Sequence, residues 1–514
     1  MLRRASKATP DQRERNDKGL YRSHVTLKSV TLKELITTAL DKDLDLPNTE
    51  VSSVAQDNRK VVRGTVFVAR SGEVADGHDY AADAAKRGAV AIVGERRLEN
   101  LHGLPYIHTE DAKLAIAKLA AAFWNNPSQD MFVLGVTGTD GKTTTSYMLH
   151  HLLSGSYKTA LLSTAAICIG EEDLDLEGHF TTPEAPEVQS LLARFRDAGC
   201  THAVIEASSH GFAQARLAEV DFDIGVWTNL TPEHLDFHKT FENYRDAKQT
   251  LMRLAMVSLL NRDDPEFASF AKASKAYKSY GESSESDWRV LNIREVGVGL
   301  EFTLTVNKKS YDVILPMVGR YNVHNALAAL SAAAQTGIEM PILLERLQTF
   351  GGVPGRMQVV QREPFAVVVD FAHTPSALEK ALAALRPSTS GRLIVVIGAA
   401  GERDPGKRAP LGRVAVQHAD LAIFTEEDHR SENLDAILAQ MGQGAVSAGG
   451  ETTLDFWCIG DRREAISLAV QIARSGDTVL LAGKGHERSL ERGDETLVWD
   501  EVKEARAALQ TEPS

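Results

Sequence analysis

The sequence predicts an α/β protein with three domains. Its 514 residues suggest this number at roughly 100–200 residues per domain. Short apolar runs of strand length alternate with helical segments, a pattern that favours parallel, doubly wound sheets. Two clusters of turn-forming residues interrupt the alternation, at 125–128 (NNPS) and 351–355 (GGVPG). We therefore expect a flexible tail over 1–24 and domains over 25–127, 128–351 and 352–514.

The expected elements follow the chain in order. In the first block we expect strands over Thr65–Ala69 and 89–93 and helices over 80–87 and 111–124. In the second, an apolar strand from Met131 leads into a glycine- and threonine-rich turn and a helix over 145–153, and residues 288–315 predict an antiparallel insert. In the third, four apolar runs predict parallel strands at Ala366–Asp370, Leu393–Ile397, Leu421–Phe424 and Thr478–Ala482.

Composition narrows the class of protein. With 43% hydrophobic and 25% charged residues the chain has ordinary globular composition, and its formal charge of −13 argues against a nucleic-acid or anionic-membrane binder. The three cysteines form no CxxC pair, which disfavours a zinc ribbon or a disulfide framework and fits a reducing compartment. No apolar run reaches the ~18 residues needed to span a bilayer. We expect small-molecule substrates, no nucleic-acid or membrane partner, and a monomer.

The strongest local signal is a phosphate-binding loop. Residues 135–144 are GVTGTDGKTT, placed between an apolar strand and a helix. Glycines let backbone amides approach phosphates, and the helix N-terminus adds partial positive charge. Lys142 would contact the terminal phosphates, and the Thr143 hydroxyl would bind Mg²⁺. This pattern predicts a nucleotide site.

A second group of polar residues follows two later strands. Glu206 ends a predicted strand, and His234 lies in the segment 227–238 (WTNLTPEHLDFH), which is followed by 244–248 (YRDAK). A carboxylate and an imidazole at neighbouring strand ends beside a phosphate loop would suit a second Mg²⁺. The alternative is that the histidines of this segment are solvated loop residues.

These motifs, in this order, resemble the Mur ligase family. The resemblance includes GTDGKTT, EASSHGFAQAR, TNLTPEHLDFH and YRDAK, and continues through GRYNVHN, VPGRM, DFAHTP, GERDPGKR and GKGHE. It covers about residues 45–490 and is closest to the branch that adds the third residue of the peptidoglycan stem. The family implies a small N-terminal UDP-binding αβ domain, a central phosphate-loop ATPase-like domain with a parallel sheet, and a C-terminal Rossmann-like domain that binds the amino acid.

The resemblance also implies an activity. ATP would convert the D-glutamate carboxylate of a UDP-muramoyl dipeptide into an acyl phosphate, which an incoming amine attacks to form an amide. The enzyme would be an ATP-dependent carbon–nitrogen ligase with Mg²⁺ as cofactor, working in the bacterial cytoplasm. The alternatives are another Mur-type amide ligase, or a phosphate-loop ATPase without ligase activity.

Site residues are carried over position by position. The implied catalytic residues are Lys142, Lys248, Glu206 and His234, and the implied metal ligands are Thr143, Glu206, His234 and Lys248, the last in carbamylated form. Implied ATP contacts are Gly138, Thr139, Asp140, Gly141, Lys142, Thr143, Thr144, Asn325, Arg356, Asp370 and His373. Implied muramoyl-dipeptide contacts are Gln56, Asn58, Glu73, Val74, Ala75, Thr181, Thr182, Ser208, Gln214 and Arg216. Implied amino-acid contacts are Arg403, Glu427, Asp428, His429, Arg430, Gly483 and Glu487.

The third substrate is predicted from one short segment. Relatives that use meso-diaminopimelate carry Asp-Asn-Pro-Arg where this chain has Glu427-Asp-His-Arg430. The extra carboxylate of Asp428 would suit the bare ammonium of lysine or ornithine through a charge-assisted hydrogen bond. Arg430, which is retained, would suit the second carboxylate of diaminopimelate. The pattern favours L-lysine or L-ornithine, with meso-diaminopimelate next.

Overall fold

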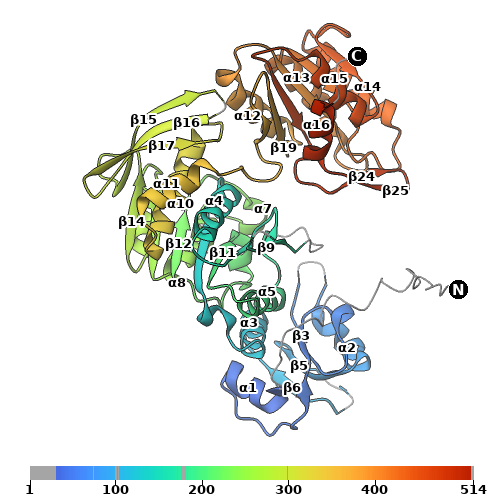
Figure 1. Cartoon of the computed structure of the whole chain (residues 1–514). Helices are drawn as coiled ribbons and strands as arrows, with labels where there is room; N and C mark the ends of the chain where they lie inside the picture. The colour runs from blue at the N-terminus through green and yellow to red at the C-terminus, as the bar shows by residue number, and fades with distance from the viewer. Residues whose placement is uncertain are drawn as a thin grey trace, which may run out of the picture. The chain divides into compact units, whose positions relative to one another are not determined.

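The computed structural model describes residues 30–72, 75–98, 101, 103–170, 172–174, 181–297 and 299–510 (Figure 1). They divide into two compact units. Unit 1 holds the described residues up to Asp130 together with 184–199 and 215–220, and unit 2 holds the rest up to Gln510. The tail expected over 1–24 lies outside the described residues.

Unit 1 is built on a small parallel sheet. Its strands are β3 (Ser53–Ala55), β4 (Thr65–Ala69), β5 (Ala89–Gly94) and β6 (Tyr106–His108), paired in that order. Its helices are α1 (Leu32–Leu40), α2 (Ala81–Arg87), α3 (Ala112–Phe123) and α5 (Ala185–Asp197), and the strands β1 (Val30–Thr31) and β2 (Glu50–Val51) form a separate antiparallel pair. Helices α1 and α3 pack on one face of the sheet and α2 on the other. Every fully buried strand residue here is apolar or a hydrogen-bonded threonine.

Unit 2 contains an eleven-stranded mixed sheet with a parallel centre. The parallel strands are β7 (Phe132–Thr137), β8 (Thr159–Leu162), β11 (His202–Glu206), β12 (Ile224–Trp227), β13 (Val257–Asn261) and β14 (Tyr277–Gly281). One edge continues through β9 (Ile167–Ile169) and β10 (Glu172–Asp173), and the other through β15 (Trp288–Val296), β16 (Gly299–Val306) and β17 (Lys309–Leu315). Strands β15 to β17 pair antiparallel, as predicted for 288–315.

The strand order marks where a ligand would bind. The sequence of neighbours is β8-β11-β7-β12-β13, so β7 lies between two strands that come later in the chain. In parallel sheets, crevices form at the carboxyl ends of strands where the chain direction switches sides. The loops that follow β7, β11 and β12 therefore meet at one edge of the sheet, and these are the loops that hold the predicted nucleotide-binding residues.

Helices cover both faces of this sheet. They are α4 (Lys142–Ser154), α6 (Ser209–Ala213), α7 (Leu235–His238), α8 (Phe241–Leu254), α9 (Phe267–Ala273), α10 (Tyr321–Ala333) and α11 (Met340–Gln348). Side chains of α4, α10 and α11 join one apolar core with the sheet. On the opposite face, Leu251 of α8 approaches Gly135 of β7, and Phe270 of α9 stacks on Trp227 at a ring distance of 3.9 Å.

Unit 2 also contains a six-stranded sheet in the order β18-β19-β23-β20-β21-β22. Its strands are β18 (Gln358–Gln361), β19 (Ala366–Asp370), β20 (Leu393–Ile397), β21 (Leu421–Phe424), β22 (Phe456–Cys458) and β23 (Thr478–Ala482), all parallel except β18. Helices α12 (Pro375–Leu385), α13 (Arg408–His418) and α14 (Leu434–Ser447) cover one face, and α15 (Arg462–Ile472) and α16 (Glu501–Gln510) the other. A hairpin of β24 (Ser489–Arg492) and β25 (Glu495–Val498) follows β23. This is the predicted doubly wound arrangement.

The predicted strands of the third block are confirmed residue for residue. The largest boundary difference is the helix expected from Thr145, which begins at Lys142. Gly141 takes a left-handed conformation (φ 81°) directly before it, so the GKTT segment forms the first helical turn. No helix in the described part of the chain is long and apolar enough to cross a membrane.

Candidate active site

The phosphate loop between β7 and α4 depends on two glycines. A Cβ at Gly138 (φ 152°) would lie 1.8 Å from Thr228 Oγ1, and one at Gly141 (φ 81°) would lie 2.3 Å from Asn325 Oδ1. Side chains at these positions are therefore excluded by contact and, at Gly141, by backbone conformation. The loop is packed between the end of β12 and the face of α10.

The first turn of α4 presents the groups that a phosphate needs. Lys142 Nζ donates to the Thr139 carbonyl oxygen at 2.8 Å, so the ammonium folds back over its own loop. The N–H groups of a first helical turn have no intrahelical acceptor and are available to an anion. Asp140 is exposed and its N–H donates to Asn229 Oδ1 at 2.9 Å, while Thr144 is half-buried in this turn.

Glu206 is the buried carboxylate beside the loop. It ends β11, which pairs directly with β7, and Oε1 accepts from Thr143 Oγ1 at 2.9 Å. Oε2 accepts from Ser163 Oγ and from the Thr164 N–H at 3.0 Å. These donors keep the carboxylate oriented toward the Thr143 hydroxyl. A hydroxyl and a carboxylate side by side are oxygen ligands of the type that Mg²⁺ prefers, so this pair fits the predicted metal.

His234 lies in a different local setting. Its side chain is 45% exposed, its backbone is left-handed (φ 55°), and its ring lies 4.8 Å from that of His210 and 6.3 Å from that of Tyr244. Tyr244 Oη in turn hydrogen-bonds Thr139 Oγ1 of the phosphate loop at 3.0 Å. Within the described ranges, no three His, Cys, Asp or Glu side chains lie close enough together to hold a metal ion.

Lys248 is buried directly beneath the phosphate loop. Nζ donates to the Gly138 carbonyl oxygen at 2.5 Å and lies 4.6 Å from the centre of the Tyr244 ring. Burial, reinforced by repulsion from Lys142, lowers the pKa of Lys248 well below its usual value. Burial therefore favours the neutral amine, which is the form that can act as a nucleophile.

The predicted muramoyl-dipeptide residues fall in both units, and each group is described by itself. In unit 1, Glu184 accepts from Gln56 Nε2 at 2.6 Å and from the Arg216 guanidinium at 2.5 Å. Asn58 Nδ2 donates to Asp83 at 2.8 Å. The Ala75 carbonyl accepts from the Gly72 N–H at 3.0 Å, whereas Glu73 and Val74 lie outside the described residues.

In unit 2 the remaining members surround the end of β11. Thr182 Oγ1 donates to the Glu206 carbonyl at 3.2 Å and accepts from the Ser208 N–H and Oγ at 3.1 and 3.0 Å. Thr181 Oγ1 accepts from Thr164 at 3.0 Å, and the Gln214 N–H donates to the His210 carbonyl at 2.9 Å. Thr181, Thr182 and Ser208 therefore share a hydrogen-bond network with Glu206, the predicted metal ligand.

The nucleotide residues predicted downstream of the loop contact both main-chain and side-chain groups. Asn325 Nδ2 donates to Asn322 Oδ1 at 2.8 Å. Asp370 accepts from the N–H groups of Met357 and Ala372 at 2.7 and 2.8 Å, and burial raises its pKa. The Arg356 guanidinium lies 5.7 Å from the centre of the Phe371 ring, and His373 Nδ1 donates to the Phe371 carbonyl at 2.9 Å.

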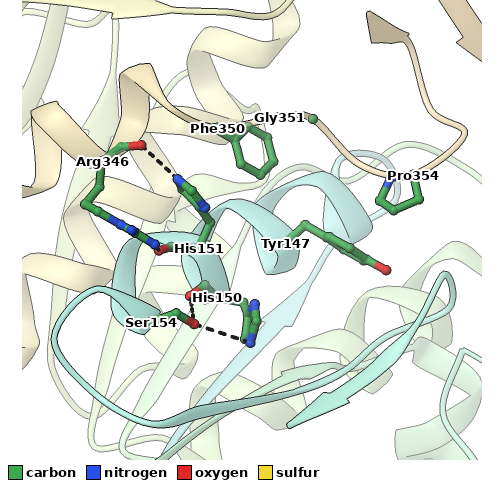
Figure 2. Close-up of a pocket in the computed structure, with 9 residues that line it drawn as sticks. Tyr147, His150, His151, Ser154, Arg346, Phe350, Gly351 and Pro354 are labelled. Carbon is green, nitrogen blue, oxygen red and sulfur yellow. Dashed lines mark hydrogen bonds between the residues drawn. The ribbon is translucent and has the colours of Figure 1, made fainter. Parts of the chain in front are cut away.

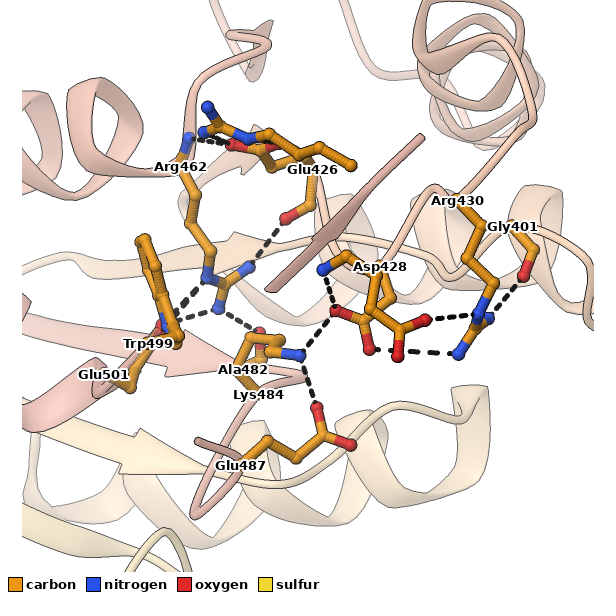
Figure 3. Close-up of polar contacts among 12 residues, drawn as sticks. Gly401, Glu426, Asp428, Arg430, Arg462, Ala482, Lys484, Glu487, Trp499 and Glu501 are labelled. Carbon is orange, nitrogen blue, oxygen red and sulfur yellow. Dashed lines mark hydrogen bonds and ion pairs between the residues drawn. The ribbon is translucent and has the colours of Figure 1, made fainter. Parts of the chain in front are cut away.

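The predicted amino-acid residues form a network of charges at the carboxyl ends of β21 and β23 (Figure 3). Lys484 Nζ lies between Asp428 Oδ1 at 2.8 Å and Glu487 Oε2 at 2.6 Å. Arg430 lies beside Asp428 in the same picture, and its NH1 donates to the Gly401 carbonyl at 2.7 Å. Asp428 is buried rather than turned to water, and one of its oxygens is already bound by a cation.

The other predicted members of this set differ in burial. Glu427 is buried with an Oε2 atom that accepts no hydrogen bond within the described structure, and burial raises its pKa. Gly483 (φ 106°) faces that oxygen, since a Cβ there would lie 3.1 Å from it. His429 Nδ1 donates to the Glu432 carbonyl at 3.2 Å, and Arg403 is exposed on the loop after β20.

A separate cavity of about 230 Å³ lies on the outer side of α4 (Figure 2). Its lining includes Tyr147, His150 and Arg346, together with the 350–354 segment. Arg346 donates to the His151 carbonyl at 2.7 Å and is thereby tied to the helix. None of the lining residues belongs to the predicted sets, so this cavity is not the predicted substrate site.

Several residues of the site were not assigned from the sequence. Ser163, Thr164, Lys484 and Glu491 hold predicted residues in place through side-chain or main-chain contacts. Lys484 could have been assigned, because it lies inside the GKGHE motif. The other three carry no local signal, since only the strand order and the docking of the β24 hairpin bring them to the site.

Comparisons with known proteins agree over most of the chain. Residues 136–333 match the model of the Mur ligase middle domain, 355–485 that of the Mur ligase glutamate ligase domain, and 50–124 that of the Mur ligase family catalytic domain. The chain is 47% identical to a UDP-N-acetylmuramyl-tripeptide synthetase of Deinococcus radiodurans, over 90% of this chain and 95% of that protein. It is 42% identical to one from Roseiflexus, with the same two coverages.

A solved structure agrees with the fold. The structure of a UDP-N-acetylmuramoyl-L-alanyl-D-glutamate–2,6-diaminopimelate ligase matches 94% of this chain and 99% of its own, with a TM-score of 0.70 and 30% identity. The similar proteins thus include both tripeptide synthetases with no amino acid in their name and a ligase named for diaminopimelate.

Proposed function

The chain belongs to the Mur ligase family and is an ATP-dependent ligase of peptidoglycan synthesis that joins a carboxylic acid to an amino acid, and from this premise we propose that it adds the third residue of the peptide stem. The acceptor would be UDP-N-acetylmuramoyl-L-alanyl-D-glutamate. The observation that carries the proposal is the shared network in which Thr143 of the phosphate loop, Glu206 and the dipeptide residues Thr182 and Ser208 are joined by hydrogen bonds.

The reaction would begin at the phosphate loop. A carboxylate is a poor electrophile, so the γ-phosphoryl group of ATP passes to the D-glutamate carboxylate and gives an acyl phosphate and ADP. Lys142 would offset the charge on the transferred phosphoryl oxygens, and the first turn of α4 would hold the other phosphates. The amine of the incoming amino acid then attacks the acyl carbon, and inorganic phosphate leaves.

The metal would be Mg²⁺, held by Thr143 and Glu206 together with phosphate oxygens. When bound, it would neutralise phosphate charge that the protein's cations do not reach. We propose that carbamylated Lys248 supplies a second anionic ligand near His234. In this form Nζ becomes part of a carbamate, which replaces a cation that would repel the metal.

For the third substrate we propose L-lysine or L-ornithine, with meso-diaminopimelate as the second candidate. The predicted subsite holds the carboxylates of Glu427, Asp428 and Glu487, which suits a distal ammonium. The retained Arg430 is the observation that favours diaminopimelate, because a guanidinium binds carboxylates in a fork geometry.

The test is amide formation and phosphate release with ATP, Mg²⁺ and the UDP-muramoyl dipeptide, with each of the three amino acids offered separately. Turnover with L-lysine or L-ornithine alone supports the proposal as stated. Turnover with meso-diaminopimelate alone keeps the ligase and contradicts the substrate preference. ATP hydrolysis that needs no dipeptide would instead favour the phosphate-loop ATPase.

A matched pair of variants checks the role of the loop. Lys142→Ala should abolish turnover while the thermal unfolding midpoint is retained, because Lys142 is only half-buried and makes one main-chain hydrogen bond. Lys309→Ala, an exposed lysine on β17 of the same sheet, should leave turnover unchanged. Full activity in Lys142→Ala would contradict the assignment of the phosphate loop.

A further inference from the structure

Arg430, the cation expected to receive a second substrate carboxylate, already has a carboxylate partner. Its Nε donates to Glu491 Oε2 at 2.6 Å, and its NH1 donates to the Gly401 carbonyl at 2.7 Å. Its NH2 lies 4.0 Å from Asp428 Oδ2. The guanidinium contacts oxygen atoms on three sides, and two of these oxygens belong to carboxylates. Its positive charge is therefore compensated, and it attracts an anionic ligand only weakly.

The position of Glu491 is set by the backbone. Strand β24 lies along the 428–430 segment, where the Glu491 N–H donates to Asp428 Oδ1 at 3.0 Å and the Arg430 N–H donates to the Glu491 carbonyl at 3.2 Å. The next turn adds a bond from the Gly493 N–H to the Arg430 carbonyl at 2.7 Å. Arg430 itself has a left-handed backbone (φ 51°), and its Nε donates to Glu491 of β24 at 2.6 Å. The Arg430–Glu491 contact is therefore part of how the hairpin docks.

The Arg430–Glu491 pair changes the net charge of the predicted amino-acid subsite. Lys484 is shared by Asp428 and Glu487, so that group carries one excess negative charge. Arg430 and Glu491 cancel each other. The network drawn in Figure 3 around Asp428 therefore favours an ammonium and offers no uncompensated cation to a carboxylate.

We propose that Glu491 is a specificity-determining residue that acts through Arg430. By pairing with the guanidinium it withholds the charge that the distal carboxylate of a 2,6-diamino diacid needs, and it thereby selects a diamino acid with a single carboxylate. This inference rests on the proposed function. The diacid is disfavoured because its distal carboxylate would lie beside the carboxylates of Glu491 and Asp428 as well as beside Arg430. Like charges at this position therefore select against the diacid.

The decisive variant is Glu491→Gln, which keeps the side-chain shape and an acceptor oxygen but removes the charge. We expect kcat/KM for meso-diaminopimelate to rise at least about tenfold, the size of one restored charge-assisted hydrogen bond. The gain should come from a lower KM for meso-diaminopimelate, so the ratio of kcat/KM for meso-diaminopimelate to that for L-lysine or L-ornithine should rise by the same factor. Glu491→Met, which removes charge and hydrogen bonding at similar length, should give the same direction if Glu491→Gln folds poorly.

Two controls separate a charge effect from a structural one. Glu495→Gln removes an exposed carboxylate on β25 of the same hairpin and should leave both substrates unchanged. Arg430→Gln combined with Glu491→Gln should show no gain for diaminopimelate, because the proposed effect passes through the arginine.

The outcomes can be told apart. An unchanged substrate ratio in Glu491→Gln, or an equal loss with all three amino acids, overturns the role of Glu491 and leaves the ligase intact. A gain that persists in the double variant also overturns it. If wild type ligates none of the three amino acids, the proposed function fails and this inference fails with it.

Discussion

Lys248 shows how burial can prepare a side chain for chemistry. Nζ has a main-chain carbonyl and an aromatic ring as its neighbours, and its pKa is lowered well below the usual value by burial. Carbamylation requires an uncharged amine, and a lowered pKa raises the fraction of the amine that is in this form at any given pH. The same burial would leave an unmodified ammonium poorly solvated.

We predict that Lys248 is carbamylated. Protein equilibrated with ¹³C-bicarbonate should show a carbamate carbon signal by NMR that Lys248→Ala lacks and Lys309→Ala retains. Lys248→Ala should lose at least about a hundredfold in kcat, because the metal loses an anionic ligand, and short carboxylic acids should restore part of it. A wild-type protein with full activity and no carbamate signal would contradict this prediction.

Residue identities in the site could be predicted where a motif carries them. Thr143 and Glu206 are hydrogen-bonded in the structure, and Lys142 precedes Thr143 in the first turn of α4, because a phosphate loop has a fixed relation to its strand and helix. Their roles stay predictions. Glu491 could not be assigned, because nothing near it in sequence identifies Arg430 as its partner. The net charge of a subsite depends on pairs of residues that lie far apart in the sequence. A motif contains only one residue of such a pair.

At the scale of elements, the phosphate loop is a closely packed turn of the central sheet. We predict that Gly138→Ala loses at least about a hundredfold in turnover, because the added methyl would overlap Thr228 Oγ1 and push the loop off the end of β12. Gly337→Ala is the matched control: Gly337 also has positive φ (92°), but nothing lies within 4 Å of its Cβ position. It should lose only about 1 kcal/mol of stability and keep its activity. Equal loss in both variants would assign the effect to backbone strain alone.

The start of β11 carries a pH-dependent contribution to stability. His202 stacks on Tyr157 at a ring distance of 3.9 Å, and burial lowers its pKa to about 4, against about 6.5 in an unfolded chain. Between these values the unfolded state binds more protons, so the stabilisation is complete above pH 6.5 and is lost as pH falls toward 4.

We predict that this histidine accounts for about 2 kcal/mol of the stability lost between pH 7.5 and pH 5. The free energy of unfolding of His202→Gln, measured with urea at each pH, should fall by that amount less than the free energy of wild type over this pH range. His108→Gln, at an exposed position of β6 in unit 1, is the matched control and should keep the wild-type dependence. If His202→Gln and wild type lose stability in parallel, the assigned protonation is wrong.

Element prediction succeeded where apolar runs are short and bounded. The four strands of the third block match because each is fully or almost fully buried on both faces, so its apolar run ends where the strand ends. The start of α4 was missed by three residues, since Lys142 and the threonines after it carry no apolar periodicity. The helix begins directly after Gly141. In the sequence, a glycine at this place is compatible with a turn that continues as well as with the start of a helix.

At the scale of the whole molecule, the compact units do not follow the linear order of the chain. Residues 184–199, which include α5, belong to unit 1 although they lie within the range predicted for the central domain. Seven of the thirteen residues of α5 are buried, which is more than one amphipathic stripe. Helix α5 packs against α3, and Arg196 donates to the Trp124 carbonyl at 3.1 Å. The predicted boundary at 127/128 therefore separates two helices that cover each other.

We predict that a fragment of residues 128–351 is largely insoluble, whereas residues 1–351 form a soluble, cooperatively unfolding protein. The shorter fragment leaves the α3-facing side of α5 exposed, and an apolar helix surface without its cover promotes aggregation. Soluble yield and thermal unfolding followed by circular dichroism are the measurements. Arg196→Ala in the full chain tests the same contact more gently, and should lower the unfolding midpoint because the Trp124 carbonyl at the end of α3 loses its donor. A soluble 128–351 fragment with the same midpoint as 1–351 would show that the central fold needs nothing from unit 1, and the boundary at 127/128 would then stand as a true domain boundary.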